Sequence, residues 1–168
     1  AAAGYGMYLA AIEASKKDDF EGHLKGCAAR LMSTRPTAVN LSLAVQTQLH
    51  AMEVSGDAKE KVSMAKATAA LIANQDVEQC KKIGEHGVKI IEEISKKKGG
   101  VVNVMTHCNA GWLAFVDYGT ASAPVFEAVK RGIKVKVIVS ETRPRNQGAL
   151  TAWEYAQAGI PHEIIADN

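Results

Sequence analysis

The stretch GGVVNVMTHCNAG at residues 99–111 decides the fold, because the spacing of apolar residues changes there. Before it, apolar residues recur at every third or fourth position, which is typical of amphipathic helices. Within it, a short β-rich apolar run extends from Val101 to Met105. Further strands are expected at 135–139 and 162–166, and helices at 120–131 and 149–158. Strands that alternate with helices predict a parallel sheet. We therefore expect an α/β fold in which 99–168 form the truncated first half of a Rossmann-like lobe.

Residues 1–98 are expected to form a separate N-terminal helical lobe. Pro36 disfavours helix at the residue before it and can begin the next helix. Gly84 and Gly87 are expected to interrupt the last helical stretch. The cations Lys96–Lys98 suit the C-terminal end of a helix. The expected helices are 1–15, 18–31, 37–54, 58–82 and a last one that ends at about residue 97.

Composition limits the classes of function. The chain has 168 residues, 47% of them apolar, and a formal net charge of +2. This balance gives no electrostatic reason to expect a nucleic-acid partner, and no apolar run is long enough to cross a membrane. The 3 cysteines are widely spaced and form no CxxC motif, which argues against a disulfide framework and a zinc site. We therefore expect a cytoplasmic protein with free thiols.

The two ends of the sequence favour an interior piece of a longer protein. There is no initiator Met, and the small apolar N-terminus lacks the basic residues of a signal peptide. The last expected strand is followed only by Asp167 and Asn168, although a parallel strand buried on both faces needs covering helices. The alternative is a complete small domain that ends in an edge strand.

Ligands of open parallel sheets bind beyond the carboxyl ends of the strands. That rule selects three polar segments as the candidate site: 106–111, 140–148 and 167–168. In the first, Cys108 lies beside His107. A cationic setting would favour its thiolate, whereas a nearby phosphate would favour a neutral thiol that can donate a proton. The alternatives are a buried structural cysteine and a histidine that only holds a backbone carbonyl.

The loop at 140–148 is the best candidate for binding an anion. Arg143 and Arg145 supply charge, and Gln147 supplies hydrogen-bonding groups close to a helix start. Arg35, just before another expected helix start, is a second candidate. The alternative is that these arginines are ordinary solvated surface residues.

Other chemistries find no support in the sequence. The first strand is followed by HCNAGW and not by GxGxxG, so a dinucleotide site is unsupported. The sequence also lacks a P-loop, HExxH, GxSxG and an acidic metal cluster. We therefore expect no metal and no cofactor.

Several long motifs resemble the methylthioribose-1-phosphate isomerase family. They are STRPTAVNL (33–41), THCNAG (106–111), ETRPRNQG (141–148) and LTAWE (150–154), with IGEHG (83–87) and 159–168 also similar. The resemblance implies an aldose–ketose isomerase, acting in methionine or 5'-deoxynucleoside salvage, that converts an aldose 1-phosphate into the ketose 1-phosphate. It also implies Cys108 as the catalytic thiol and Arg35 and Gln147 as substrate-binding residues.

The same resemblance implies a homodimer and site residues outside this chain. The family's catalytic aspartate and its Asn-Lys contacts are expected beyond residue 168, and its RGAP phosphate motif before residue 1. We therefore expect Asp167 to border the site without being the catalytic acid. We also expect the 168 residues alone to be inactive.

The resemblance leaves alternatives open. Methylthioribose 1-phosphate and 5-deoxyribose 1-phosphate both carry an apolar 5-substituent, which gives an enzyme little to discriminate. Ribose-1,5-bisphosphate isomerase shares the HisCysAsn loop, although the ThrAlaTrpGlu stretch favours the methylthioribose branch. The regulatory subunits of the translation-initiation guanine-nucleotide exchange factor share the fold without the chemistry. They have no evident reason to keep a HisCysAsn loop beside a phosphate clamp.

Overall fold

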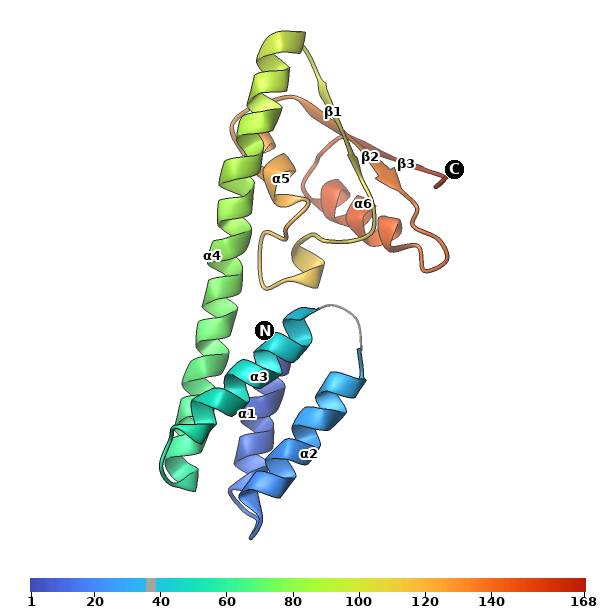
Figure 1. Ribbon diagram of the computed structural model, residues 1–168. Coiled ribbons are helices and arrows are strands. Elements are labelled where there is room, and N and C mark those ends of the chain that lie inside the picture. Colours follow the sequence, from blue (N-terminus) through green and yellow to red (C-terminus); the bar gives the residue numbers. More distant parts are fainter. Residues whose placement is uncertain (36–38) are drawn as a thin grey trace. The chain divides into compact units, whose positions relative to one another are not determined.

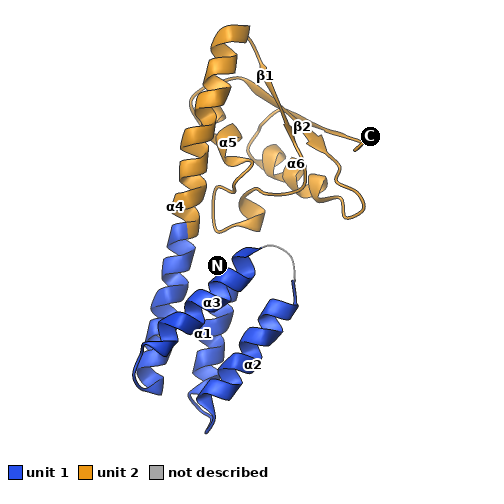
Figure 2. Cartoon of the chain, in the orientation of Figure 1, with its two compact units in different colours: residues 1–75 blue, residues 76–168 orange. Residues whose placement is uncertain are grey.

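The computed structural model describes residues 1–35 and 39–168. These residues divide into two compact units, 1–75 and 76–168 (Figure 2). Helix α4 (Ala58–Lys98) contributes its first part to unit 1 and its second part to unit 2. The sequence predicted a boundary after residue 98, where the helical pattern ends. The structure divides the chain after residue 75, within α4, because the two parts of this helix pack in different units.

Unit 1 is built from helices with small apolar side chains between them. Its elements are α1 (Ala2–Ala14), α2 (Phe20–Ser33), α3 (Val39–Glu53) and the first part of α4 (Figure 1). Its buried core consists of Met7, Ala10, Ala11, Leu24, Ala28, Val45, Met52 and Ala65. Small residues at a contact allow helix axes to approach closely. The predicted helices are confirmed, except that the start of the third, with Pro36, lies outside the described residues.

One buried polar side chain links the helices of unit 1. Gln48 on α3 is fully buried, and its Nε2 donates hydrogen bonds of 3.0 Å to two carbonyl oxygens. The acceptors are Gly4 on α1 and Ala65 on α4. Because a buried amide needs hydrogen-bond partners, these two bonds fix α3 against both neighbours.

Unit 2 contains a parallel sheet with the strand order β1 (Val102–Thr106), β2 (Val135–Ser140), β3 (His162–Ile165). Helix α5 (Ala123–Lys130) connects β1 to β2, and α6 (Gln147–Gln157) connects β2 to β3 (Figure 1). This order is that of one half of a doubly wound sheet. The predicted α/β fold, with a helical part followed by parallel strands, is confirmed.

The core of unit 2 lies on one face of the sheet. It joins strand residues to residues of all the helices of the unit: Val88, Ile91, Val102, Val125, Ala128, Val135, Val137, Val139, Tyr155 and Ile160. The opposite face carries Asn103, Met105 and Lys136, and Met105 is 65% exposed. Successive strand residues point to opposite faces. Within residues 76–168, the sheet is therefore packed on one face only.

Helix α4 runs without a break through Gly84 and Gly87, which corrects the predicted interruption. The two glycines have a packing role instead. A Cβ atom on Gly84 would lie 3.2 Å from the carbonyl oxygen of Ala123, and one on Gly87 would lie 2.5 Å from Pro124 Cγ. The start of α5 thus lies directly against α4, and this close approach requires residues without side chains.

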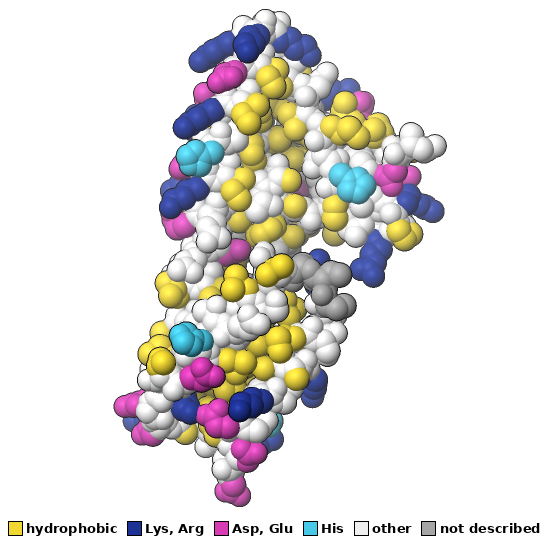
Figure 3. Space-filling model, viewed as in Figure 1, with side chains coloured by type: hydrophobic (Ala, Val, Ile, Leu, Met, Phe, Trp, Pro, Cys, Tyr) yellow, Lys and Arg dark blue, Asp and Glu magenta, His cyan; other side chains and the backbone are white. Residues whose placement is uncertain are grey.

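Charged side chains cover much of the surface. Lysines gather at the C-terminal end of α4, where Lys96, Lys97 and Lys98 form the last turn (Figure 3). Cations at this end of a helix oppose its dipole. Within the described ranges, no helix combines the length and the apolar character needed to cross a membrane.

Candidate active site

Hydrogen bonds join the carboxyl ends of the strands of unit 2. The segment after β1 contacts the segment after β2, because the Cys108 N–H donates to Thr142 Oγ1 at 2.8 Å. The segment after β2 contacts the segment after β3, because the Asp167 carboxylate accepts from the N–H groups of Thr142 and Arg143 at 2.9 and 2.7 Å. The three segments that the strand-end rule selected therefore lie together, as predicted.

Cys108 is held through its main chain. Besides the N–H bond to Thr142, its carbonyl oxygen accepts from Thr151 Oγ1 at 2.8 Å. Its φ of 66° lies in the left-handed region, which a non-glycine residue keeps only where its surroundings impose it. Both bonds use main-chain atoms, so the half-buried thiol takes no part in them. The thiol can therefore serve chemistry without being needed for the loop's structure.

A buried carboxylate lies beneath the loop that carries Cys108. Glu154 on α6 is fully buried, and its Oε1 accepts from Asn109 Nδ2 at 2.9 Å and from the Leu113 N–H at 3.1 Å. Gly111 leaves the space for this carboxylate, since a Cβ atom there would lie 1.6 Å from Glu154 Oε2. A hydrogen bond within a protein contributes about 0.5–1.5 kcal/mol to stability. Glu154 is thus a main support of the loop.

Asp167 acts as an anion that fixes the loop after β2. In addition to two backbone N–H groups, it accepts the hydroxyl of Ser140. The Ser140 hydroxyl and then the N–H groups of Arg143 and Thr142 lower the pKa of Asp167 to about 2. A carboxylate engaged in this way is a poor proton donor near neutral pH. This agrees with the expectation that Asp167 borders the site without being its acid.

His107 joins the same network. Its Nδ1 lies 2.8 Å from Ser140 Oγ. Because the single hydroxyl hydrogen of Ser140 is donated to Asp167, the contact with His107 requires a proton on Nδ1. The second ring nitrogen, Nε2, belongs to an exposed side chain beside Cys108. The partner of His107 Nδ1 is thus a side-chain hydroxyl and not the backbone carbonyl of the structural alternative, and a role as a base stays a prediction.

Gln147 is the first residue of α6 and directly follows the polar loop. Its Oε1 atom is buried and has no hydrogen-bond partner in the part of the chain that the structure describes. Since buried amide oxygens normally have a partner, this atom is suited to accept from a ligand hydroxyl. Arg143 and Arg145 of the preceding loop are exposed. The structure thus brings Gln147 and Cys108 into the same unit, at the same edge of the sheet.

Arg35 belongs to unit 1. It directly follows Thr34, the residue that caps the C-terminal end of α2, and its side chain is exposed. A cation there also opposes the dipole of α2, so a purely structural role remains open for it. Arg35 and Gln147 thus belong to different units of the chain.

The other two cysteines differ from Cys108. Cys80 is buried in α4, and burial followed by the nearby Asp76 and Asp117 carboxylates raises the pKa of its thiol. A buried thiol of this kind is a packing residue. Cys27 is half-buried on α2 in unit 1 and contacts His23. Cys108 is the only one of the three at the carboxyl edge of the sheet.

The supporting residues Thr142, Thr151 and Glu154 were not predicted from the sequence. For two of them, Thr151 and Glu154, the sequence contains a pattern that could have indicated their role. Gly148, Thr151 and Glu154 recur at spacings of three on α6, so small and polar residues lie on a face that would otherwise be apolar. That pattern indicates a helix face against a polar loop. The partner Asn109 is far away in sequence and could not be inferred from spacing.

Together, the fold and this site define an α/β protein with proton-active and hydrogen-bonding groups at the ligand-binding edge of a parallel sheet. The chain belongs to the Initiation factor 2 subunit family, whose model matches residues 1–168.

Curated proteins named methylthioribose-1-phosphate isomerase match most of this chain. The methylthioribose-1-phosphate isomerase of Methylorubrum populi is 50% identical over 167 residues, which are 99% of this chain and 44% of that protein. The one of Escherichia coli is 52% identical over 140 residues, which are 82% of this chain and 38% of that protein. The chain thus spans less than half the length of these relatives.

Similar solved structures include an isomerase and a subunit of a translation initiation factor. The 5-methylthioribose 1-phosphate isomerase from Pyrococcus horikoshii has a TM-score of 0.82 and 36% identity, covering 99% of this chain and 46% of that one. The translation initiation factor eIF-2B subunit delta from A. fulgidus has a TM-score of 0.78 and 42% identity, covering 99% and 48%.

Proposed function

We propose that this chain supplies part of the active site of an aldose–ketose isomerase. The substrate is 5-methylthioribose 1-phosphate or 5-deoxyribose 1-phosphate, and the product is the corresponding ribulose 1-phosphate. The observation that carries the proposal is the position of Cys108. Its main chain is held by Thr142 and Thr151 at the carboxyl edge of the sheet, while its side chain stays out of those bonds. The relatives named methylthioribose-1-phosphate isomerase support it.

The reaction explains why a thiol and hydrogen-bonding groups are needed. The phosphate on the anomeric oxygen prevents spontaneous ring opening, so the ring oxygen must be protonated as its bond to C1 breaks. Hydrogen then moves from C2 to C1 while the C2 hydroxyl loses its proton, which leaves the ketone at C2. A neutral Cys108 thiol can donate a hydrogen bond or a proton in this sequence. Such a group is worth about 10²–10⁴ in rate.

Substrate binding is assigned to Arg35 and Gln147. An arginine can hold a phosphate through two parallel hydrogen bonds, and the buried Oε1 of Gln147 can accept from a sugar hydroxyl. Glu154 and Thr151 are proposed as positioning residues, since they hold the loop through bonds to Asn109 and to the Cys108 carbonyl oxygen. No metal or cofactor has a step in this mechanism.

A second candidate function is a non-catalytic subunit of a translation initiation factor. One observation favours it. The chain is 42% identical to the eIF-2B subunit delta from A. fulgidus, and only 36% identical to the P. horikoshii isomerase. A regulatory subunit, however, gains nothing from a loop that holds Cys108 in a left-handed conformation. The ribose-1,5-bisphosphate isomerase alternative keeps that loop and differs only in the 5-substituent.

We also infer a homodimer in the cytoplasm. Within unit 2, Ile83, Ile90 and Ile94 of α4 are 41%, 65% and 43% exposed. Their spacing of seven and four residues places them on one face of the helix, and contiguous exposed apolar patches mark interaction surfaces. Sedimentation of the full-length protein should give twice the monomer mass, and Ile90→Lys should shift it toward the monomer.

The decisive test is a coupled isomerase assay on the full-length protein with three substrates. Methylthioribose 1-phosphate and 5-deoxyribose 1-phosphate should be converted, and ribose 1,5-bisphosphate should not. Preference for the bisphosphate would select the alternative enzyme. No conversion of any of the three would favour the non-catalytic subunit. The isolated 168 residues are expected to be inactive, and full turnover by them would overturn the assignment of residues.

A further inference from the structure

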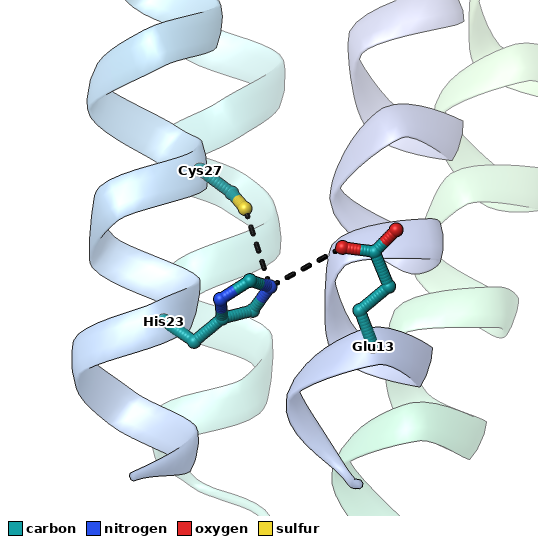
Figure 4. A group of neighbouring side chains, drawn as sticks. All are labelled: Glu13, His23 and Cys27. Carbon is teal, nitrogen blue, oxygen red and sulfur yellow. Dashed lines mark hydrogen bonds and ion pairs between the residues drawn. The ribbon is translucent and has the colours of Figure 1, made fainter. Parts of the chain in front are cut away.

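Unit 1 holds a cluster of three potential metal ligands that the isomerase mechanism does not use. His23 and Cys27 lie one helical turn apart on α2, and Glu13 faces them from α1 (Figure 4). The ligand atoms Oε2, Nε2 and Sγ all lie within 4.8 Å of one another. Two of the three residues are half-buried, and Glu13 is exposed. Cysteine, histidine and a carboxylate together form a ligand set suited to zinc.

Two of the three distances between the ligand atoms, both measured from His23 Nε2, agree with tetrahedral coordination. His23 Nε2 lies 3.6 Å from Cys27 Sγ and 3.3 Å from Glu13 Oε2. A Zn²⁺ ion with bonds of about 2.3 Å to sulfur and about 2.0–2.1 Å to nitrogen and oxygen would hold these atoms about 3.6 and about 3.3 Å apart. Both partners lie around the same ring nitrogen (Figure 4), so this nitrogen points toward the space between them. An ion in that space would face all three ligand atoms, which lie within 4.8 Å of one another.

We propose that Glu13, His23 and Cys27 bind one divalent transition-metal ion, with Zn²⁺ as the best match. This site is separate from the proposed sugar-phosphate site. Three protein ligands leave a fourth position for water or a small ligand. Glu13 and Cys27 also line a surface pocket of about 350 Å³ with Leu31 and Arg30, so a ligand at that position would lie at the edge of this pocket.

Lys17 opposes metal binding and offers a control. Its Nζ lies 3.0 Å from His23 Nδ1. An ammonium donating to Nδ1 places the imidazole proton on Nε2, the atom that must be free to bind a metal. The exposed lysine must therefore move aside when the metal binds. A carboxylate in its place would instead accept the Nδ1 proton and orient the ring, as outer-shell carboxylates do in metal sites.

Co²⁺ titration of the full-length protein tests the site, because a bound thiolate gives a charge-transfer absorption. One equivalent should bind with this absorption, and Cys27→Ser should abolish it. Cys108→Ser should leave it unchanged. Glu13→Gln, which alters an exposed side chain, should weaken binding at least about tenfold, and Lys17→Glu should tighten it about tenfold or more. Circular dichroism and thermal unfolding check that each variant is folded.

A second measurement does not depend on cobalt. Zn²⁺ should protect Cys27 from alkylation, as read by mass spectrometry, in the wild type and not in His23→Gln. The proposal is overturned if wild-type protein gives no thiolate–Co²⁺ absorption, if that absorption survives in Cys27→Ser, or if Zn²⁺ protects Cys27 equally in His23→Gln. A hydrogen-bonded cluster without affinity for metals would give the first result.

Discussion

The two units of the chain differ in what their buried polar side chains hold: Gln48 in unit 1 bonds helices, whereas Glu154 in unit 2 bonds a loop. In unit 1, the apolar core carries Gln48, whose two hydrogen bonds add to a close packing of alanines and methionines. In unit 2, an apolar core on one face of the sheet is combined with a polar network at the strand ends, with Glu154 at its centre. Packing alone sets helix positions within a broad tolerance, whereas hydrogen bonds with defined directions fix individual loop atoms.

Backbone strain follows the same division. Among the described residues, those other than glycine with positive φ are Cys108, Tyr118, Thr142 and Asn146, all in unit 2. Thr142 is β-branched, for which this conformation is unfavourable. Strain of this kind costs about 1–3 kcal/mol per residue and persists only where surrounding contacts impose it. The difference indicates that unit 2 gives up stability to hold its loops in place, whereas the described residues of unit 1 show no such strain.

The largest effect should come from a change that leaves the network of unit 2 intact. Cys108→Ser alters only the side chain, while the bonds to Thr142 and Thr151 use main-chain atoms. Under the proposed function, kcat should fall about 10²–10⁴-fold, with a smaller change in KM, and the unfolding midpoint should hardly move. Steady-state kinetics of the full-length protein give kcat and KM, and urea unfolding gives the midpoint. Cys80→Ala is the control, and unchanged kcat in Cys108→Ser would remove the thiol from the mechanism.

The next effect concerns stability and compares the central polar residue of each unit. Glu154→Ala removes one of the two acceptors of Asn109 Nδ2, which keeps its bond to Thr151 Oγ1, and leaves the Leu113 N–H without its acceptor, so it should cost about 2 kcal/mol of unfolding free energy. Gln48→Met keeps the volume and removes bonds to carbonyls that belong to helices, so it should cost only about 1 kcal/mol.

Denaturant unfolding measures both costs. Glu154→Gln keeps one acceptor oxygen and should lie between Glu154→Ala and the wild type. Equal costs for Glu154→Ala and Gln48→Met would contradict the division between the units.

A smaller effect compares two glycines inside helices. On α2, a Cβ atom added to Gly26 would meet nothing within 4 Å, so Gly26→Ala should stabilise by up to about 1 kcal/mol through helix propensity. In unit 2, a Cβ atom on Gly87 would lie 2.5 Å from Pro124 Cγ, so Gly87→Ala should instead destabilise by about 1–3 kcal/mol. Thermal unfolding gives the signs. Stabilisation by both substitutions would show that α5 moves freely away from α4.

Sequence periodicity was sufficient to predict the helices, the strands and the parallel sheet, because each depends on neighbours along the chain. The strand-end rule then placed Cys108 and Gln147 correctly at one edge. Neither the periodicity nor the strand-end rule could predict contacts between segments that are distant in the sequence. The two glycines of α4 pack against Ala123 and Pro124, which lie far away in the sequence. The role of Glu154 likewise depends on its bond with the distant Asn109. For the same reason, the spacing of the cysteines could not reveal the cluster in unit 1, because its three potential ligands come from two helices.

The smallest expected effect is the contribution of Asp167 to stability at low pH. Its pKa is lowered from 3.8 to about 2, chiefly by the Ser140 hydroxyl and the N–H groups of Arg143 and Thr142. A carboxyl with a lowered pKa stabilises the fold fully above its unfolded pKa, and this stabilisation is lost as the pH falls toward the folded pKa. Wild-type unfolding free energy should therefore decline between about pH 4 and pH 2, more steeply than in Asp167→Asn. The effect should be small because the side chain is exposed. Identical slopes for the two proteins would mean that Asp167 does not hold the loop after β2, and that the end of β3 is joined to that loop by other contacts, such as the bond from the Glu141 N–H to the Ile165 carbonyl oxygen.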